Sequence, residues 1–324
     1  MELIKIAISE YATLTGYLHE TSSEMANIQA YPAMLVLPGG GFRFCSDREA
    51  EPVAMAYFAE GYQAFVLDYT TITKKPDAVI DDPVNDAELA LKTIREHAAD
   101  YRVDAKKVAM IGFSGGGHLA AAEVTHRKTR PDVLLLGYPG IVHSDLRALD
   151  CPDIPEKVDS TTPPSFIFGT RDDTVVPPVH LLTFAEALNK AGVDYELHIF
   201  RSGVHGLSIA KSLTSNGSAS NINPVFGEWF PMSVRWLKDK LGDFTIYGVN
   251  DGRYGKFSID KALGDILGDE KASQILKNIL PALAETAEKN PVVKGVSIRQ
   301  LSGMLPGMDG ETLEKLDREL LALG

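Results

Sequence analysis

The stretch "KVAMIGFSGGGHLAAAE", from Lys107 to Glu123, decides the fold class of this chain. A short apolar run precedes Ser114, and an alanine-rich run that favours a helix follows it. A strand, a glycine turn and a helix in this order can serve two chemistries. The N–H groups at the start of the helix can bind a phosphate, or the turn can present the hydroxyl of Ser114 as a nucleophile. The rest of the chain distinguishes the two.

The composition is that of an ordinary globular protein. The 324 residues are 44% hydrophobic and 23% charged, which is enough for one sizeable core and a small second domain. The net charge of −12 argues against nucleic acid or an anionic membrane surface as a partner, since both require basic patches. Formation of a homo-oligomer stays an open question.

Several signals favour a cytoplasmic protein. The first ten residues, "MELIKIAISE", alternate like a strand and lack the basic flank and long apolar region of a signal peptide. No apolar run approaches the ~18 residues of a membrane span. Cys45 and Cys151 have no partner at metal-ligand spacing. We therefore expect two free thiols in a reducing cytoplasm, and no metal.

Apolar runs typical of strands alternate with stretches typical of helices up to about residue 242. Buried strands are predicted at 33–38, 64–69, 107–112, 132–139, 164–170 and 194–200. One intervening helix has Asp82 as its expected N-cap and Pro83 at its first position. Strands that are apolar throughout and separated by helices predict a mostly parallel sheet with helices on both faces. Sites in such sheets gather at the carboxyl ends of the strands.

The composition changes beyond Gly242. A glycine-rich segment leads into short amphipathic helices, and this part contains neither histidine nor cysteine. We therefore predict two domains, a larger α/β domain at 1–242 and a small helical domain at 243–324. Leucines at helical spacing are expected to form the core of the second domain. An assembly or carbohydrate-binding role for the helical domain is the non-enzymatic alternative.

Polar or glycine-rich segments follow four of the predicted strands. In chain order these are a glycine cluster, Ser114, the acidic pair Asp172 and Asp173, and His205. Serine, aspartate and histidine in this order at strand ends are typical of the α/β-hydrolase fold. His205 can remove the proton of the serine hydroxyl during attack. Either aspartate can orient the imidazole and stabilise its cation.

The glycines around these strand ends have predicted tasks of their own. Small residues at Gly112 and Gly116 let the strand bend sharply into the helix. An ester carbonyl under attack forms an oxyanion that needs preorganised donors. We expect these donors to be the backbone N–H groups of Gly115, Gly40 and Gly41, because glycine lets the backbone approach a substrate closely.

The phosphate-loop alternative fits poorly. The pattern GxxxxGK[ST] is missing because Gly117 is followed by His118 and Leu119. The dinucleotide pattern GxGxxG is also missing, and the turn follows a central strand instead of the first. Three further histidines are expected to be structural: His97, His118 and His198.

Longer stretches resemble one family. "LPGGGFRFCSDREAEPVA", "GFSGGGHLAA" and "PPSFIFGTRDDTVVPPVHLL" are similar to acetyl esterase/acetyl xylan esterase-like α/β-hydrolases, close to the feruloyl-esterase-type branch. The resemblance covers roughly Leu35 to Leu241. It implies that Ser114 is the nucleophile and His205 the base. The family's D-x-x-V-P motif matches "DTVVP" and so implies Asp173 as the acid, with Asp172 remaining open.

The resemblance also implies a reaction. We expect a carboxylic-ester hydrolase that works through an acyl-enzyme without a cofactor. The segment between the strand at 132–139 and the strand at 164–170 is too short for a large lid, which favours an open pocket for small acyl groups, with acetyl preferred. Phe42 and Phe44 are expected to wall the acyl side. Acetyl esters of sugars or oligosaccharides are the expected substrates, and a feruloyl-type or general short-chain carboxylesterase is the alternative. Relatives often carry alanine where this chain has Gly115, a change that retains the amide donor.

Overall fold

The computed structural model describes residues 1–25, 27–142, 148–151, 154–244, 257–302 and 308–323. The chain divides into two compact units. The first comprises Met1–Glu20 and Ala30–Asp243, and the second comprises Thr21–Gln29 and Phe244–Gly324. Among the described residues, every helix is too short or too polar to span a bilayer.

The first unit is built on one eight-stranded sheet with the order β1-β2-β4-β3-β5-β6-β7-β8. Its strands are β1 (Glu2–Ala7), β2 (Thr13–Leu18), β3 (Tyr31–Leu37), β4 (Gln63–Asp68), β5 (Val103–Phe113), β6 (Val133–Gly137), β7 (Ser165–Thr170) and β8 (Tyr195–Phe200). The pairings from β4 through β3 to β8 are all parallel. β1 and β2 form an antiparallel hairpin, and β2 pairs antiparallel with β4. The predicted mostly parallel sheet is confirmed, and β2 is an additional strand that the sequence analysis did not predict.

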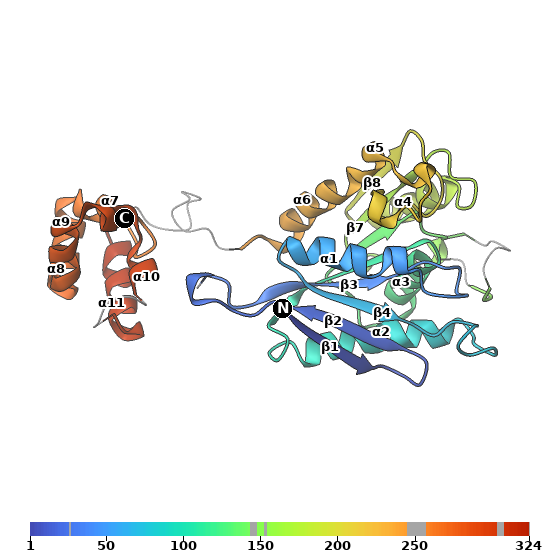
Figure 1. Cartoon of the computed structure of the whole chain (residues 1–324), viewed down its shortest axis with the longest axis horizontal. Coiled ribbons are helices and arrows are strands. Elements are labelled where there is room, and N and C mark those ends of the chain that lie inside the picture. The colour runs from blue at the N-terminus through green and yellow to red at the C-terminus, as the bar shows by residue number, and fades with distance from the viewer. Residues whose placement is uncertain (26, 143–147, 152–153, 245–256, 303–307, 324) are drawn as a thin grey trace. The chain divides into compact units, whose positions relative to one another are not determined.

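Helices cover both faces of this sheet. They are α1 (Glu51–Ala59), α2 (Asp81–Glu96), α3 (Ser114–His126), α4 (Val179–Ala191), α5 (Pro224–Gly227) and α6 (Trp229–Leu241), with short 3₁₀ turns η2 (Asp47–Glu49), η3 (Pro155–Lys157), η4 (Ser212–Thr214) and η5 (Ala219–Asn221). Figure 1 shows α1 and α2 on opposite sides of the sheet.

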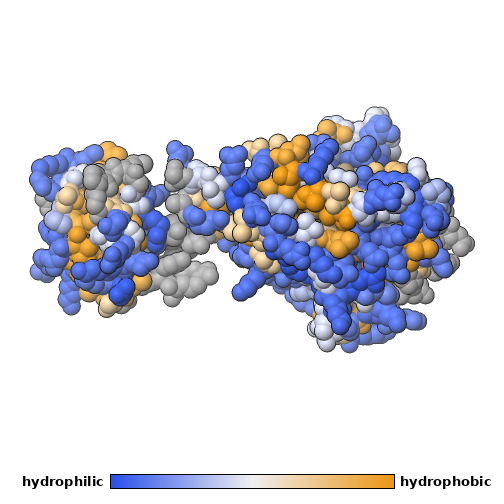
Figure 2. Space-filling model, turned by 90° about the horizontal axis from the view of Figure 1, so that it is seen from below, coloured by the Kyte–Doolittle hydropathy of each residue, from blue (hydrophilic) through white to orange (hydrophobic). Residues whose placement is uncertain are grey.

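Successive strand residues face opposite sides of the sheet, which places alternate side chains in two cores. Leu35 and Met110 pack with residues of α2, α3 and α4. Val36 and Ile111 pack with residues of α1 and α6. All four are fully buried, as expected for strands covered on both faces. Hydrophilic side chains cover much of the surface in Figure 2, with apolar residues gathered in smaller areas.

The start of α2 differs from the prediction. The helix begins at Asp81 and its N-cap is Ile80, which makes no side-chain capping bond. Asp82 therefore lies in the first turn. Its carboxylate accepts a hydrogen bond from the Val79 N–H at 2.8 Å and pairs with Lys75 at 2.9 Å. These partners precede the helix and fix its start from outside.

The second unit has a core of its own. Its helices are α7 (Leu263–Leu267), α8 (Glu270–Ile279), α9 (Pro281–Lys289), α10 (Ile298–Leu301) and α11 (Gly310–Leu321), and its 3₁₀ turns are η1 (Ser23–Met25) and η6 (Pro291–Gly295). The core includes the fully buried Leu263, Leu276 and Leu316, so the expected apolar faces do form a separate cluster. α8 and α9 are separate helices because Pro281 has no N–H to continue the first one.

Candidate active site

The site begins at the turn that joins β5 to α3. Ser114 is the first residue of α3, and its φ of +52° lies in the left-handed region, which is uncommon for a residue with a Cβ. The bend requires glycine at two positions, one before and one after the serine. A Cβ on Gly112 would lie 2.2 Å from the Gly116 carbonyl oxygen, and a Cβ on Gly116 would lie 2.2 Å from that of Leu37. Such a strained strand-to-helix turn exposes the serine Oγ.

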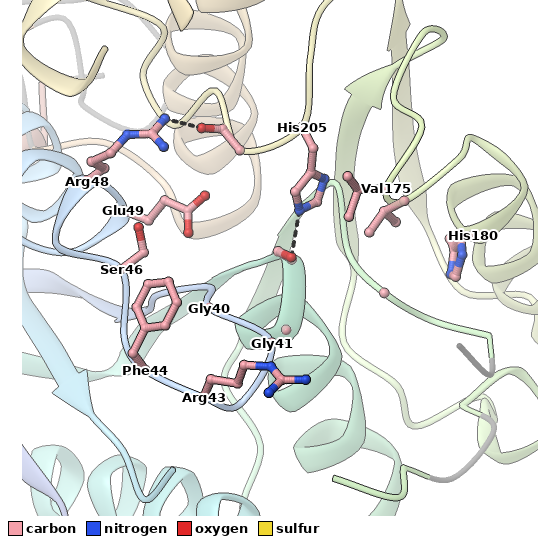
Figure 3. A pocket seen from close by; sticks show the side chains of 15 residues that line it. Gly40, Gly41, Arg43, Phe44, Ser46, Arg48, Glu49, Val175, His180 and His205 are labelled. Carbon is pink, nitrogen blue, oxygen red and sulfur yellow. Dashed lines mark hydrogen bonds between the residues drawn. The ribbon is translucent and has the colours of Figure 1, made fainter. Parts of the chain in front are cut away.

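A chain of two hydrogen bonds starts from this hydroxyl. Ser114 Oγ lies 2.8 Å from His205 Nε2, and His205 Nδ1 lies 2.7 Å from Asp173 Oδ2 (Figure 3 shows the first bond). A carboxylate can only accept, so Nδ1 carries the proton. In the neutral imidazole, Nε2 then accepts from the serine hydroxyl. This is the tautomer that a general base requires.

The structure distinguishes the two adjacent aspartates. The Asp173 side chain is only 1% exposed, and its second oxygen accepts from the N–H groups of Val175 and Val176 at 2.9 Å each. Asp172 points elsewhere, since its carboxylate accepts from Arg171 at 3.0 Å and is half exposed. Asp173 is therefore the aspartate that faces His205.

The glycine loop after β3 lies against the start of α3. Gly40 and Gly41 have φ values of +130° and +59°, and both border the same pocket as Gly115 and Ser114. A Cβ on Gly115 would lie 3.0 Å from the Gly41 nitrogen, so the two backbones nearly touch. Within the described parts of the chain, neither the Gly41 nor the Gly115 N–H donates to another protein group. Both amides are thus available to an oxyanion.

Comparisons with known proteins show which family this chain resembles. The BD-FAE family model matches residues 22–132. The solved structure of MGS-M1, an α/β-hydrolase enzyme from a Medee basin deep-sea metagenome library, is 44% identical, with a TM-score of 0.70 over 74% of this chain and 98% of that chain. An acetyl ester-xyloside bifunctional hydrolase from Caldicellulosiruptor lactoaceticus is 30% identical, with a TM-score of 0.60 over 70% of this chain and 88% of that chain.

This chain belongs to the acetyl xylan esterase-like α/β-hydrolases. Among curated proteins, the acetylxylan esterase of Xylanibacter ruminicola is 26% identical over 236 residues, which are 65% of this chain. The chain spans less than half the length of the curated relatives it matches first, 45% of this esterase and 35% of another.

The pocket of this acetyl xylan esterase-like hydrolase has a volume of about 330 Å³ beside Ser114. Phe44 is 58% exposed and borders it together with Val175 and Val176. The expectation that Phe42 also walls the pocket is wrong. Phe42 is fully buried, with its ring edge-on to those of Tyr69 and His118. Phe42 has a φ of +64°, and its side chain fills the core under the glycine loop.

Several pocket residues of this hydrolase were missed by the sequence analysis. They are Arg43, Ser46, Arg48, Glu49 and His180. His180 lies near the start of α4, and its Nδ1 accepts from the N–H groups of Ile141 and Val142 at 3.0 and 3.2 Å. Arg48 and Glu49 belong to η2 and follow Gly41 by only seven and eight positions. That proximity was the one signal in the sequence that could have pointed to them.

Of the residues expected to be structural, His118 is fully buried, with Nδ1 2.6 Å from the Gly140 carbonyl oxygen. His198 lies in β8 and contacts Glu196. Among the described residues, neither Cys45 nor Cys151 is joined in a disulfide, and burial raises the pKa of Cys45. The segment expected to be too short for a lid lies partly outside the described residues, at 143–147 and 152–153.

Proposed function

We propose that this chain is a serine carboxylesterase that hydrolyses short-chain acyl esters, with acetyl groups preferred. The observation that carries the proposal is the hydrogen-bonded chain from Ser114 through His205 to Asp173. The three side chains come from three different strand ends of one mostly parallel sheet. This order of donors and acceptors activates a hydroxyl that is otherwise a weak nucleophile.

In the acylation step, Ser114 Oγ attacks the ester carbonyl carbon while His205 Nε2 takes its proton. Asp173 holds the imidazole in the required tautomer and stabilises the imidazolium. The carbonyl oxygen becomes an oxyanion, which accepts hydrogen bonds from the N–H groups of Gly115, Gly40 and Gly41. The tetrahedral intermediate then collapses. His205 gives its proton to the departing alcohol, and the acyl group stays on Ser114.

In the deacylation step, water attacks the acyl-enzyme. His205 Nε2 takes a proton from the water as it attacks the acyl carbon, and the same backbone amides stabilise the second oxyanion. Collapse releases the carboxylic acid, and the proton returns to Ser114 Oγ. Apart from the attacking water, every group in both steps belongs to this chain or to the ester substrate.

The pocket supports a small acyl group. Its volume of about 330 Å³ is at the small end of ligand pockets, and Phe44, Val175 and Val176 give it apolar walls. The relatives named above include an acetylxylan esterase and an acetyl ester-xyloside hydrolase. We therefore propose acetyl esters of sugars or oligosaccharides as the substrates.

The test is a panel of p-nitrophenyl acyl esters from C2 to C12, together with acetylated xylo-oligosaccharides and methyl ferulate. It is run on the wild type, on Ser114→Ala and on Ser218→Ala, an exposed-serine control. We expect acetate to be cleaved faster than butyrate, little cleavage beyond C8, and near-complete loss in Ser114→Ala alone. Faster turnover of methyl ferulate than of acetyl esters would favour the feruloyl-type alternative. Full activity in Ser114→Ala would refute the assignment of the nucleophile.

A further inference from the structure

Glu49 is a buried carboxylate that the esterase mechanism does not use. It lies in η2 and is 4% exposed. Figure 3 shows it beside Arg48, with its carboxylate pointing toward the side of the pocket where His205 lies. Burial of a carboxylate costs free energy unless neighbouring groups donate hydrogen bonds to it. The groups that donate to Glu49 therefore indicate its role.

One oxygen of Glu49 contacts the glycine loop. Oε2 accepts from the Gly39 N–H at 2.9 Å. The fit is close, because a Cβ on Gly39 would lie 2.6 Å from Oε2 and 3.0 Å from the Cβ of Ser114. Glu49 therefore supports the loop that presents Gly40 and Gly41 to the oxyanion.

The other oxygen is linked through Tyr138 to the segment that follows His205. Oε1 accepts from the Tyr138 hydroxyl at 2.5 Å, and this hydroxyl in turn accepts from the Ser208 N–H at 2.9 Å. The Tyr138 ring lies edge-on to the His205 imidazole, with centroids 5.1 Å apart. Tyr138 thus links Glu49 to residues 201–214, which follow β8, carry His205 and are called the histidine loop below.

The directions of these bonds indicate the charge of Glu49. The Ser208 N–H donates into the Tyr138 hydroxyl, so the single phenolic proton is directed to Glu49. Gly39 also donates. Both oxygens of Glu49 therefore act as acceptors, the pattern of an ionised carboxylate. Burial raises the pKa of Glu49, while these two bonds and the charges of His205 and Arg48 act in the opposite direction.

We propose that Glu49 is a positioning residue that joins the glycine loop to the histidine loop and places a second negative charge beside His205. The proposal rests on the proposed role of His205 as the base. When His205 takes the serine proton it becomes a cation, and a fixed carboxylate nearby stabilises that cation more than the neutral imidazole. Glu49 acts through Gly39 and Tyr138 and does not touch the reacting atoms.

Other charged or titratable groups surround Glu49 and His205 and also contribute to the electrostatic field at the imidazole. Asp173 bonds to the other side of the imidazole, and the Tyr69 hydroxyl lies near Glu49. Arg48 holds the histidine loop by donating to the carbonyl oxygens of Gly206 and Thr214. These groups are the same in a Glu49 variant, so a change measured there reports Glu49 itself.

The experiment compares Glu49→Gln with Glu49→Asp and with Glu51→Gln, an exposed glutamate only two residues away. The titration of the His205 imidazole is followed by NMR, with its signal assigned from its loss in His205→Ala. We expect Glu49→Gln to lower the titration midpoint of His205 by about one pH unit, and Glu49→Asp and Glu51→Gln to leave it near the wild-type value. In steady-state assays, Glu49→Gln should lower kcat about 10–100-fold with little change in KM, and should move the acid limb of the kcat/KM profile to lower pH.

The outcomes separate this inference from the proposed function. An unchanged His205 midpoint in a folded Glu49→Gln variant, or an equal decrease in Glu49→Asp, would refute the charge role. If Glu49→Gln does not fold, Tyr138→Phe provides the second test. It removes the link to the histidine loop, and an unchanged kcat and pH profile there would refute the coupling. If the wild type cleaves no ester but the His205 midpoint still depends on Glu49, the proposed function fails and the electrostatic part of this inference stands.

Discussion

His205 Nε2 lies 2.8 Å from Ser114 Oγ, although 91 positions separate the two residues along the chain. In the sheet, β6 and β7 lie between β5, which leads into Ser114, and β8, which leads into the segment of His205. The histidine loop must therefore return across the ends of two strands. Arg48 donates to the carbonyl oxygens of Gly206 and Thr214, which holds the loop in that position.

Replacement of the histidine tests this contact directly. We expect His205→Gln to lower kcat for p-nitrophenyl acetate by at least about 10³-fold, because glutamine cannot accept and return the serine proton. The matched control is His198→Gln, since His198 lies in β8 outside the pocket and should retain most of the activity. Comparable losses in the two variants would mean that the effect is structural.

Two adjacent aspartates allow a paired test of the acid. Asp173→Asn should lower kcat by about 10⁴-fold, because the amide no longer fixes the tautomer of His205. Asp172→Asn removes only a half-exposed contact with Arg171 and should change kcat by less than about 3-fold. Both are measured by initial rates at saturating substrate, with circular dichroism to check the fold. A larger loss in the Asp172 variant would reverse the assignment.

Substitution of the glycine that follows Ser114 tests the position of the glycine loop. An added Cβ at Gly115 would press on Gly41 Cα and N at 3.0 Å each, so the loop must shift to make room. We expect Gly115→Ala to lower kcat about 10-fold with little change in stability, because a small displacement of an oxyanion donor weakens transition-state binding. Gly310→Ala is the control, since nothing lies within 4 Å of its added Cβ. An equal or higher kcat in Gly115→Ala would show that the loop tolerates alanine without displacement.

A second buried glutamate predicts how stability depends on pH. Glu123 lies in α3, and its carboxylate oxygens are buried without a hydrogen-bond partner among the described residues. Burial, and then the charge of Glu88, raises its pKa from 4.5 to about 8. The folded state therefore retains a proton that the unfolded chain releases. Stability from this group is complete below about pH 4.5 and is lost as the pH rises to about 8, by about 1.4 kcal/mol per pH unit.

Glu123→Gln removes that titration. In urea unfolding at pH 5, 6, 7 and 8, we expect the free energy of unfolding of the variant, relative to the wild type, to rise with pH. Glu186→Gln, a change at an exposed glutamate paired with Lys190, is the control for loss of a surface charge. A constant difference between Glu123→Gln and the wild type across the four pH values would contradict the prediction.

Removal of residues 244–324, the larger part of the second unit, tests whether catalysis requires that unit. Each unit has its own buried cluster, and all the residues proposed for catalysis belong to the first unit. We expect a chain ending at Asp243 to retain kcat for p-nitrophenyl acetate within about 3-fold. Loss of binding to xylan with unchanged turnover would support carbohydrate recognition by the helical unit, and unchanged turnover with a changed number of subunits per particle, measured by light scattering, would support assembly.

Much of the fold followed from local patterns. Short apolar runs separated by amphipathic helices predicted the parallel sheet, because only a strand covered on both faces is apolar throughout. The β2 strand was missed because its alternation is interrupted by Gly16, and its pairing depends on β1 and β4 instead of its own residues. The predicted N-cap Asp82 was wrong because partners outside the helix, Lys75 and Val79, bind that carboxylate.

The sequence by itself determined the class of this protein: a parallel sheet, a glycine-flanked serine at a strand end, and an aspartate and a histidine at later strand ends. These features depend on periodicity and chain order, and parallel sheets bring the carboxyl ends of their strands to one edge. Only the tertiary structure decided that Asp173 instead of Asp172 faces His205, that Phe42 fills the core while Phe44 borders the pocket, and that Glu49 lies beside the histidine. The physical reason is that the direction of a side chain in a loop is set by packing and hydrogen bonds with residues distant in the sequence, which no local pattern specifies.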